Sequence, residues 1–252
     1  MIRIFTLHWN AKLLLERLYN SLIPALEGLD YCWYIKDNGS SDGSKEFLES
    51  IKSEKIIPYY TGHNRHNFSE GMNILFDFAK PEDEDYILLL NNDVVFGDTT
   101  SIKKMISLFK DDVGIVGTKL LYPGTKKLAH SWIYFSKKYN YLPYHYKHGE
   151  EDNAETSKNR EVEAITAAVL LTKAKYYKQN PLDKLFFWCF EDVDFNLAIK
   201  YNMNKKIMYC GETLIYHEES VSLQKNPVNK LMMPANVKRF KDKWWGKYKL
   251  YD

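Results

Sequence analysis

The sequence predicts an α/β protein with a mostly parallel, doubly wound sheet. Strand-like and helix-like segments alternate from residue 2 to residue 121, as in successive strand–helix–strand units whose strands run parallel. An apolar fraction of 45% in 252 residues supplies the core of one domain and excludes a disordered chain. The chain has no internal repeat or linker, and 12 glycines and 8 prolines are too few for a fibrous protein.

The elements of the first half follow from apolar periodicity and from turn residues. Residues 2–8 form an apolar run expected to be a buried strand, and residues 12–23 repeat leucine along one helical stripe. Ser69 is expected to cap one helix, and Thr100 or Ser101 to begin another. The other predicted strands are 31–37, 56–60, 86–90 and 113–121, and the other predicted helices are 44–51, 69–79 and 101–110.

The second half is less regular. Residues 137–160 are polar and loop-like, and residues 162–172 are apolar and expected to form a strand or a buried segment. A helix is predicted at 191–201, a pair of strands at 207–217 and a last amphipathic helix at 234–245.

Charge and cysteine content limit the possible partners and the compartment. The 35 basic and 33 acidic residues almost cancel, so bulk charge indicates no polyanionic partner. Cys32, Cys189 and Cys210 lack the spacing of a metal site and are expected to be reduced, mostly buried thiols. The longest apolar run, residues 185–190, has the length of a strand, and no signal sequence precedes it. We therefore expect a soluble cytoplasmic protein; peripheral contact with the inner membrane face stays open.

One motif of another enzyme class matches by letter. Residues 39–43 satisfy G-x-S-x-G, the nucleophile elbow of hydrolases, which would make Ser41 a nucleophile. We favour a simple Gly/Ser turn, because the nearby Asp37 and Asp42 carboxylates oppose formation of a serine alkoxide. A serine hydrolase stays as an alternative hypothesis. Dinucleotide-binding, P-loop and H-E-x-x-H motifs do not occur in the sequence.

Polar residues follow several predicted strands at the point where each strand ends. They occupy residues 8–10, 37–42 and 91–93. The carboxyl ends of parallel strands share one edge of a sheet, where ligands bind, and carboxylates and amides there suit a nucleoside base and ribose. Residues 191–194 and His217 could hold a divalent metal and still leave a general base.

Six short motifs occur in order along residues 2–220. They are T-x-x-x-N at 6–10, D-N-x-S-x-D at 37–42, N-F-x-x-G-x-N at 67–73, L-N-N-D at 90–93, E-D-x-D at 191–194, and an H-x-x-x-S-like element at 217–222. This series resembles family 2 glycosyltransferases of the GT-A fold, and within them the rhamnosyltransferase-like branch. Asn67 stands where that branch has glycine, and asparagine tolerates the left-handed conformation that glycine allows. Asn91 leaves Asp93 as the only carboxylate of the D-x-D-type motif, a variant that is common in this branch.

The resemblance implies a Rossmann-like GT-A catalytic domain over residues 1–222, with a basic, aromatic helical tail over residues 223–252 packed on it. It implies a metal-dependent, inverting sugar transfer from a nucleoside-diphosphate donor, with UDP- or dTDP-sugars favoured, to a hydroxyl of a cell-surface glycan or lipid-linked precursor. Mn²⁺ or Mg²⁺ would be the cofactor. Two alternatives stay open: transfer to hydroxymethylated phage DNA, and a non-catalytic module that binds a nucleotide-sugar or glycan.

The resemblance also implies roles for single residues, although each has an ordinary structural interpretation as a turn or helix cap. Asp192 would be the catalytic base with Glu191 beside it, and which of the two is the base stays open. Asp93 and His217 would bind the metal. Asp37 would contact the nucleotide base. The nucleotide and donor pocket would be formed by Thr6, His8, Asn10, Asp37, Asn38, Ser40, Asn67, Asn73, Asn91 and Asn92.

Two aromatic regions carry open interpretations. The first, in or near residues 137–160, could form a wall for an acceptor sugar or simply pack against the fold. It comprises His130, Trp132, Tyr139, Tyr141, Tyr144 and Tyr146. The second is the tail from residue 225 onward, where eight Lys and Arg face two Asp. It either packs Val237, Phe240 and Trp244 on the domain or contacts an anionic membrane surface; nucleic acid is disfavoured.

Overall fold

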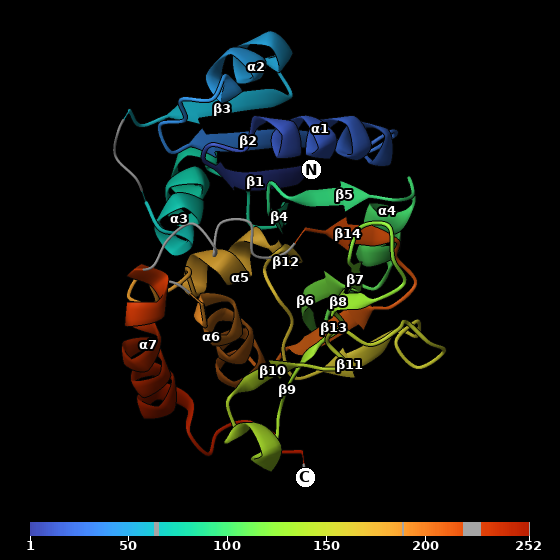
Figure 1. The fold of residues 1–252 in the computed structure, drawn as a ribbon, viewed down its shortest axis with the longest axis vertical. Coiled ribbons are helices and arrows are strands. Elements are labelled where there is room, and N and C mark those ends of the chain that lie inside the picture. Colours follow the sequence, from blue (N-terminus) through green and yellow to red (C-terminus); the bar gives the residue numbers. More distant parts are fainter. Residues whose placement is uncertain (63–65, 188, 219–227, 252) are drawn as a thin grey trace.

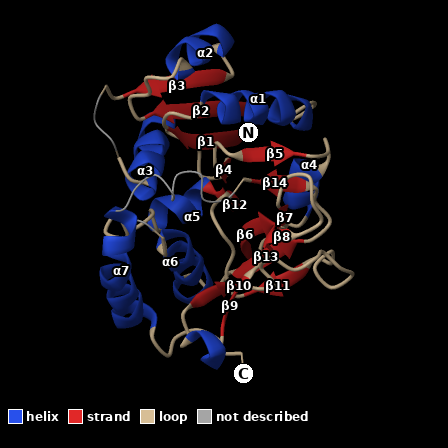
Figure 2. Cartoon of the chain, in the orientation of Figure 1, coloured by secondary structure: helices blue, strands red, loops and turns tan. Residues whose placement is uncertain are grey.

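The protein is described by a computed structural model over residues 1–62, 66–187, 189–218 and 228–251, with side chains from residue 232 in the last range. Its centre is an eight-stranded sheet in the order β11-β13-β6-β12-β4-β1-β2-β3 (Figures 1 and 2). Six of these strands point the same way, and β11 and β12 run opposite to them. The strands are β1 (Ile2–His8), β2 (Tyr31–Asp37), β3 (Ile56–Tyr60), β4 (Tyr86–Leu90), β6 (Val113–Thr118), β11 (Arg160–Val162), β12 (Val169–Lys173) and β13 (Lys206–Cys210).

Helices cover both faces of this sheet, which confirms the doubly wound α/β prediction. Side chains alternate along each strand, so Ile4 packs toward α1, α2 and α4, whereas its neighbour Phe5 packs toward α3, α5 and α6. The helices are α1 (Lys12–Ala25), α2 (Ser44–Ile51), α3 (Phe68–Ala79), α4 (Ser101–Ser107), α5 (Ala174–Gln179), α6 (Glu191–Leu197) and α7 (Val228–Trp244).

Strand β12 shapes the candidate site because it runs antiparallel between β4 and β6. Val169 at its start lies beside Leu90 at the end of β4. The backbone N–H of Asn91 donates to the carbonyl of Ala168 at 2.9 Å. The segment that precedes β12 is therefore held against the residues that follow β4.

A second sheet of four short strands lies beside the first, in the order β5-β14-β7-β8, and a hairpin of β9 and β10 follows it. The predicted strand pair at 207–217 is wrong as a pair, since β13 belongs to the central sheet and β14 to the small one. The chain leaves the central sheet at Gly211, where a side chain would lie 2.7 Å from the backbone of Lys158. The short strands are β5 (Val94–Phe96), β7 (Leu120–Leu121), β8 (Leu128–His130), β9 (Ile133–Phe135), β10 (Pro143–His145) and β14 (Ile215–His217).

Several local predictions need correction. Helix α3 is capped by Asn67 and not by Ser69: the Asn67 side chain accepts from the Glu70 N–H at 2.8 Å, and the Glu70 carboxylate accepts from the Asn67 N–H. Asn67 has a φ of −69°, so it is extended and not left-handed. The predicted helix at 191–201 changes after Leu197 into a π-helical turn, and residues 137–160 include β10 and a 3₁₀ turn. The cysteines are free, and only Cys210 is fully buried.

The C-terminal residues pack on the domain. Phe240 and Trp244 of α7 are buried with Tyr248 against Ile133 and Phe135. The Trp244 indole N–H donates to Asp194 at 2.6 Å. Figure 1 shows α7 lying alongside α6. Over the described ranges, every helix is too short or too polar to cross a membrane.

Candidate functional site

The candidate site lies at the edge where β1, β2 and β4 end. His8 and Asp37 are paired at the ends of β1 and β2, and the Asn38 N–H donates to the His8 carbonyl at 2.8 Å. Strand β4 ends one residue before Asn91, on the other side of β1. The sheet thus brings three of the polar motifs to one edge, as parallel strand ends require.

Asp37 lies at the wall of a pocket of about 490 Å³. Its carboxylate accepts from the Ser40 N–H at 3.1 Å and from the Ser40 hydroxyl, so the turn after β2 is closed around it. Asn10 closes the same turn from β1: its side-chain oxygen accepts from the Ser41 N–H at 2.7 Å. The pocket is lined by Asp37, Gly39, Ser40, Ser41, Lys45, Tyr60 and Gly62.

Lys36 is a site residue that the motifs did not indicate. It is completely buried, and its ammonium donates to the Asn38 side-chain oxygen at 2.5 Å and to the Thr61 hydroxyl at 2.8 Å. Burial lowers the pKa of Lys36 to about 8, although the charges of Asp37 and Glu70 oppose the decrease. A lysine in an otherwise apolar strand was the available signal. Lys36 joins the ends of β2 and β3 and so supports the floor of the Asp37 pocket.

His8 does not line the pocket but lies behind it, 1% exposed. Its Nε2 is 2.8 Å from the Ser44 hydroxyl, and its Nδ1 is 2.9 Å from the side-chain nitrogen of Asn92. Burial lowers the pKa of His8, against the opposing effect of the Asp37 and Asp42 charges. The imidazole is therefore neutral at neutral pH and links the end of β1 to the start of α2 at Ser44 and to Asn92, which follows β4.

Asp93 and His217 form the candidate metal pair. His217 Nε2 lies 3.1 Å from Asp93 Oδ1, which is buried and accepts no hydrogen bond from any described residue. Two donor atoms this close, one of them a carboxylate oxygen without a hydrogen bond, suit a shared divalent cation whose other ligands are substrate oxygens and water. Within the described ranges, no three His, Cys, Asp or Glu side chains converge as metal ligands.

Glu191 and Asp192 begin α6, on the far side of the segment that precedes β12. Asp192 Oδ2 accepts from the Ala167 N–H at 3.3 Å. The next residue, Ala168, accepts from the Asn91 N–H through its carbonyl. Glu191 Oε2 is buried without a hydrogen bond to the described residues. Burial raises the pKa of Glu191 to about 8, and the charge of Asp192 adds to the increase. Glu191 is thus mostly protonated at neutral pH.

Two residues with a left-handed backbone conformation directly precede this carboxylate pair. Cys189 and Phe190 have φ values of 57° and 72°, a conformation that costs a non-glycine residue on the order of 1 kcal/mol. Phe190 is held by ring contact with Phe240 of α7 at 5.3 Å. No sequence motif signals this strain, because the tail that stabilises it is fifty residues away.

Comparison with known proteins identifies the family of this chain. The family model described as Glycosyl transferase family 2 matches residues 4–186. The chain belongs to glycosyl transferase family 2. Comparison with curated proteins gives no significant match.

Solved glycosyltransferase structures share the fold at low sequence identity. A crystal structure of GalNAc-T7 with UDP, GalNAc and Mn²⁺ has a TM-score of 0.66 at 10% identity, over 86% of this chain and 43% of that one. The mannosyltransferase PcManGT of Pyrobaculum calidifontis, with GDP-Man and Mn²⁺, has a TM-score of 0.64 at 10% identity, over 98% and 65%. S. aureus TarS has a TM-score of 0.63 at 12% identity, over 96% and 44%. The chain thus spans less than two thirds of each of these structures. They confirm the GT-A fold.

Three family-motif residues have structural partners away from the pocket. Thr6 is fully buried, and its hydroxyl accepts from the Trp33 indole N–H at 2.9 Å. Asn67 caps α3. Asn73 donates to the Leu182 carbonyl at 2.9 Å and accepts from the Tyr177 hydroxyl at 2.8 Å, so both ends of its amide hold the second half of the chain against α3. Ser220 and Ser222 of the last motif lie outside the described residues.

The geometry around Ser41 gives a hydrolase no support. Ser41 is exposed, and His8 contacts Ser44 instead. Ser44 is fully buried and lies 2.5 Å from Asp42 Oδ1, to which its hydroxyl donates. The hydroxyl that meets the imidazole is therefore inaccessible to a substrate.

Of the aromatic residues interpreted either as an acceptor wall or as packing, four form stacked pairs with one another. Trp132 stacks on Tyr146 with ring centroids 4.3 Å apart, and Tyr139 stacks on Tyr144 at 3.6 Å. His130 is the member that reaches the site, since its Nε2 accepts from the Thr166 N–H at 3.3 Å, next to the residue that holds Asp192.

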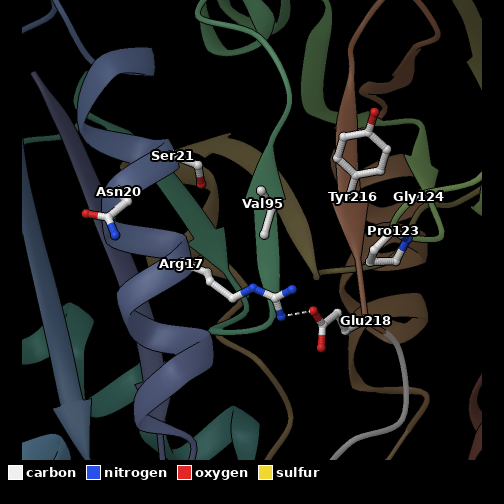
Figure 3. Close-up of a pocket in the computed structure, with 8 residues that line it drawn as sticks. All are labelled: Arg17, Asn20, Ser21, Val95, Pro123, Gly124, Tyr216 and Glu218. Carbon is white, nitrogen blue, oxygen red and sulfur yellow. Dashed lines mark hydrogen bonds and ion pairs between the residues drawn. The ribbon is translucent and has the colours of Figure 1, made fainter.

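A groove of about 360 Å³ lies between α1 and the small sheet, adjacent to the metal pair. Figure 3 shows Arg17 of α1 and Glu218 forming an ion pair at one end of it, with Tyr216 on the opposite wall from α1. Glu218 directly follows His217, and its N–H donates to the Asp93 carbonyl at 3.1 Å. The ion pair therefore tethers the end of β14 to α1.

Proposed function

We propose that this chain is a metal-dependent, inverting glycosyltransferase that moves a sugar from a nucleoside diphosphate, UDP or dTDP being favoured, to a hydroxyl of a glycan or lipid-linked precursor. The observation that carries the proposal is the Asp93–His217 pair, in which the buried Asp93 Oδ1 lies 3.1 Å from His217 Nε2 and accepts no hydrogen bond from the described residues. Two structural neighbours were solved with Mn²⁺ and with UDP or GDP-Man, which fits a diphosphate at such a pair.

The residues divide the reaction among them. The Asp37 pocket holds the nucleoside, and Asp93 with His217 would hold Mn²⁺ or Mg²⁺ at the diphosphate. The bound ion would neutralise the charge that develops on the departing diphosphate. Asp192 takes the acceptor hydroxyl proton as that oxygen bonds to the anomeric carbon and the bond to the diphosphate breaks. A single displacement of this kind inverts the anomeric centre.

Asp192 is favoured over Glu191 as the base for a physical reason. Burial raises the pKa of Glu191 to about 8, so most of it carries a proton at neutral pH, and that form cannot accept the acceptor proton. It can instead donate a hydrogen bond from its carboxyl group to a sugar hydroxyl. Asp192 is held by the Ala167 N–H and so faces the same segment as the metal pair.

The proposal is tested by thermal shift and calorimetry with UDP, dTDP and GDP, each with and without Mn²⁺. A ligand that binds only the native state raises its Tm, and we expect UDP or dTDP with Mn²⁺ to give the largest increase. Asp37→Ala should weaken nucleotide binding about tenfold while the protein stays folded, as loss of one recognition group predicts. Equal affinity in a folded Asp37→Ala variant would remove Asp37 from the site.

Product analysis separates the alternatives. A binding module would bind the nucleotide-sugar without slow hydrolysis or transfer. Sugar transfer to hydroxymethylated DNA would identify the nucleic-acid acceptor, whereas transfer only to glycan or lipid-linked acceptors supports the proposal.

A further inference from the structure

The tautomer of His8 follows from its neighbours. Asp42 Oδ1 accepts the Ser44 N–H at 3.2 Å, and Oδ2 accepts the Lys12 N–H at 2.9 Å. Partial burial acts to raise the pKa of Asp42, but the hydrogen bonds from Ser44 and Lys12 outweigh it and lower that pKa, so the carboxylate is ionised and only accepts. The Ser44 hydroxyl must therefore give its one proton to Asp42 and accept from His8 Nε2–H.

This assignment determines the other side of the ring. With the proton on Nε2, Nδ1 carries a lone pair and accepts from the side-chain NH₂ of Asn92 at 2.9 Å. One chain of hydrogen bonds thus runs from Asn92 through His8 and Ser44 to Asp42. It connects Asn92 after β4, the end of β1 and the start of α2, and it reaches the start of α1 because Asp42 accepts from the Lys12 N–H.

The chain of hydrogen bonds joins the two halves of the proposed donor site. Asn92 precedes Asp93, and the His8 carbonyl accepts from Asn38, which follows Asp37. We infer that His8 is a positioning residue, which sets the distance between the Asp37 pocket and the Asp93–His217 pair by holding Asn92 against the end of β1. A diphosphate must span that distance, and displacements of less than an ångström cost activity. The inference rests on the proposed function.

Three substitutions separate this role from simple packing. His8→Asn keeps an acceptor near the Nδ1 position and loses the Ser44 contact. His8→Gln keeps a donor near the Nε2 position and loses the acceptor for Asn92. His8→Phe loses both. Thr172→Val is the matched control, because Thr172 is also fully buried and donates one hydrogen bond, to the Gly114 carbonyl at 2.7 Å, but lies beside Ile87 at the opposite edge of the sheet.

The ligand-binding readout is the gain in UDP affinity that Mn²⁺ produces. We expect this gain to fall about tenfold in His8→Gln and His8→Phe, as for loss of residues that orient metal ligands, and to stay within about threefold of wild type in His8→Asn. Thr172→Val should lower Tm and leave the gain unchanged. Equal gains in all the His8 variants, or an equal loss in His8→Asn and His8→Gln, would overturn the inference.

A ligand-free readout keeps the inference separate from the proposed function. Nitrogen-15 NMR of the wild-type protein should show His8 protonated at Nε2 only, and the Asn92 side-chain amide resonance should move in His8→Gln and His8→Phe but not in Thr172→Val. Protonation at Nδ1, or an unmoved Asn92 resonance, would overturn the inference. Wild-type protein that shows this NMR pattern yet binds neither UDP nor dTDP with Mn²⁺ would refute the proposed function alone.

Discussion

The two sides of the candidate site differ in how fully their polar groups are satisfied. On the nucleotide side, residues 8–10 and 37–44, side chains hold one another: Asp37 binds Ser40, Asn10 binds Ser41, and His8 binds Ser44. On the reaction side, Asp93 Oδ1 and Glu191 Oε2 are buried without hydrogen bonds to the described residues. A loop whose polar groups are hydrogen-bonded keeps its shape for recognition, whereas a buried carboxyl oxygen without a hydrogen bond can accept one from a ligand. Substitutions on the two sides should therefore have different consequences.

The largest expected effect is on the reaction side at Asp192. Asp192→Asn should lower kcat about a thousandfold, the range for loss of a general base, and leave donor affinity within about twofold. Asp194→Asn is the matched control two residues along the same helix; it should lower Tm and spare most of kcat, because Asp194 binds Lys243 and Trp244. Similar kcat losses in both variants would assign the Asp192 effect to structure.

A second difference concerns the metal pair. Asp93→Asn should raise the Mn²⁺ concentration needed for half-maximal donor binding by about 10- to 100-fold. It should not lower the Tm of the metal-free protein, since it removes a buried charge that lacks a hydrogen bond. A lower metal-free Tm with normal Mn²⁺ dependence would mean that His217 stabilises Asp93 by itself, as an ordinary ion pair.

The protonated Glu191 gives the reaction side a distinct pH dependence. Its pKa is raised by burial to about 8 in the folded state, so the native protein binds this proton more tightly than the unfolded chain does. This contribution is largest below the ordinary glutamate pKa and is lost as pH rises toward 8. We expect Glu191→Gln to flatten the decline of Tm over that pH interval. An unchanged Tm–pH profile would contradict the raised pKa.

The smallest expected effect is on membrane binding by the basic tail. Lys243 already binds Asp194, and Lys238 lies 2.6 Å from Asp242, so part of the basic charge is compensated. Replacing Lys238, Arg239, Lys241 and Lys243 with Ala should reduce co-sedimentation with anionic vesicles about twofold to fivefold at low salt. Lys243→Ala alone controls for lost stability. Equal sedimentation of the wild-type and fourfold-substituted proteins would leave the tail with a packing role only.

Much of the fold was predictable because it depends on local pattern. Alternating apolar segments predict the doubly wound sheet, and the motifs that follow its strands predict Asp37 and Asp93 at one edge. The direction of β12 could not be predicted from the sequence, since side chains alternate with a period of two in parallel and antiparallel strands alike. The partners of His8, Lys36 and Asp194 were missed because each hydrogen bond joins segments that no periodicity relates. The Asn67 cap of α3 was predictable from the sequence, because Glu70, three residues later, completes a capping box.

The acidic residues of the E-D-x-D motif have two separate roles, and one of these roles depends on the C-terminal residues. Glu191 and Asp192 are the proposed reaction-side members, while Asp194, 3% exposed, pairs with the Lys243 ammonium and accepts a hydrogen bond from the Trp244 indole. A chain ending before residue 243 would remove both partners of that carboxylate, and would remove the Trp244 and Tyr248 rings packed with Phe240, the ring that contacts Phe190. Truncation of the tail would therefore inactivate the enzyme from a distance, and loss of activity in such a protein would report unfolding around α6 and not a missing substrate contact.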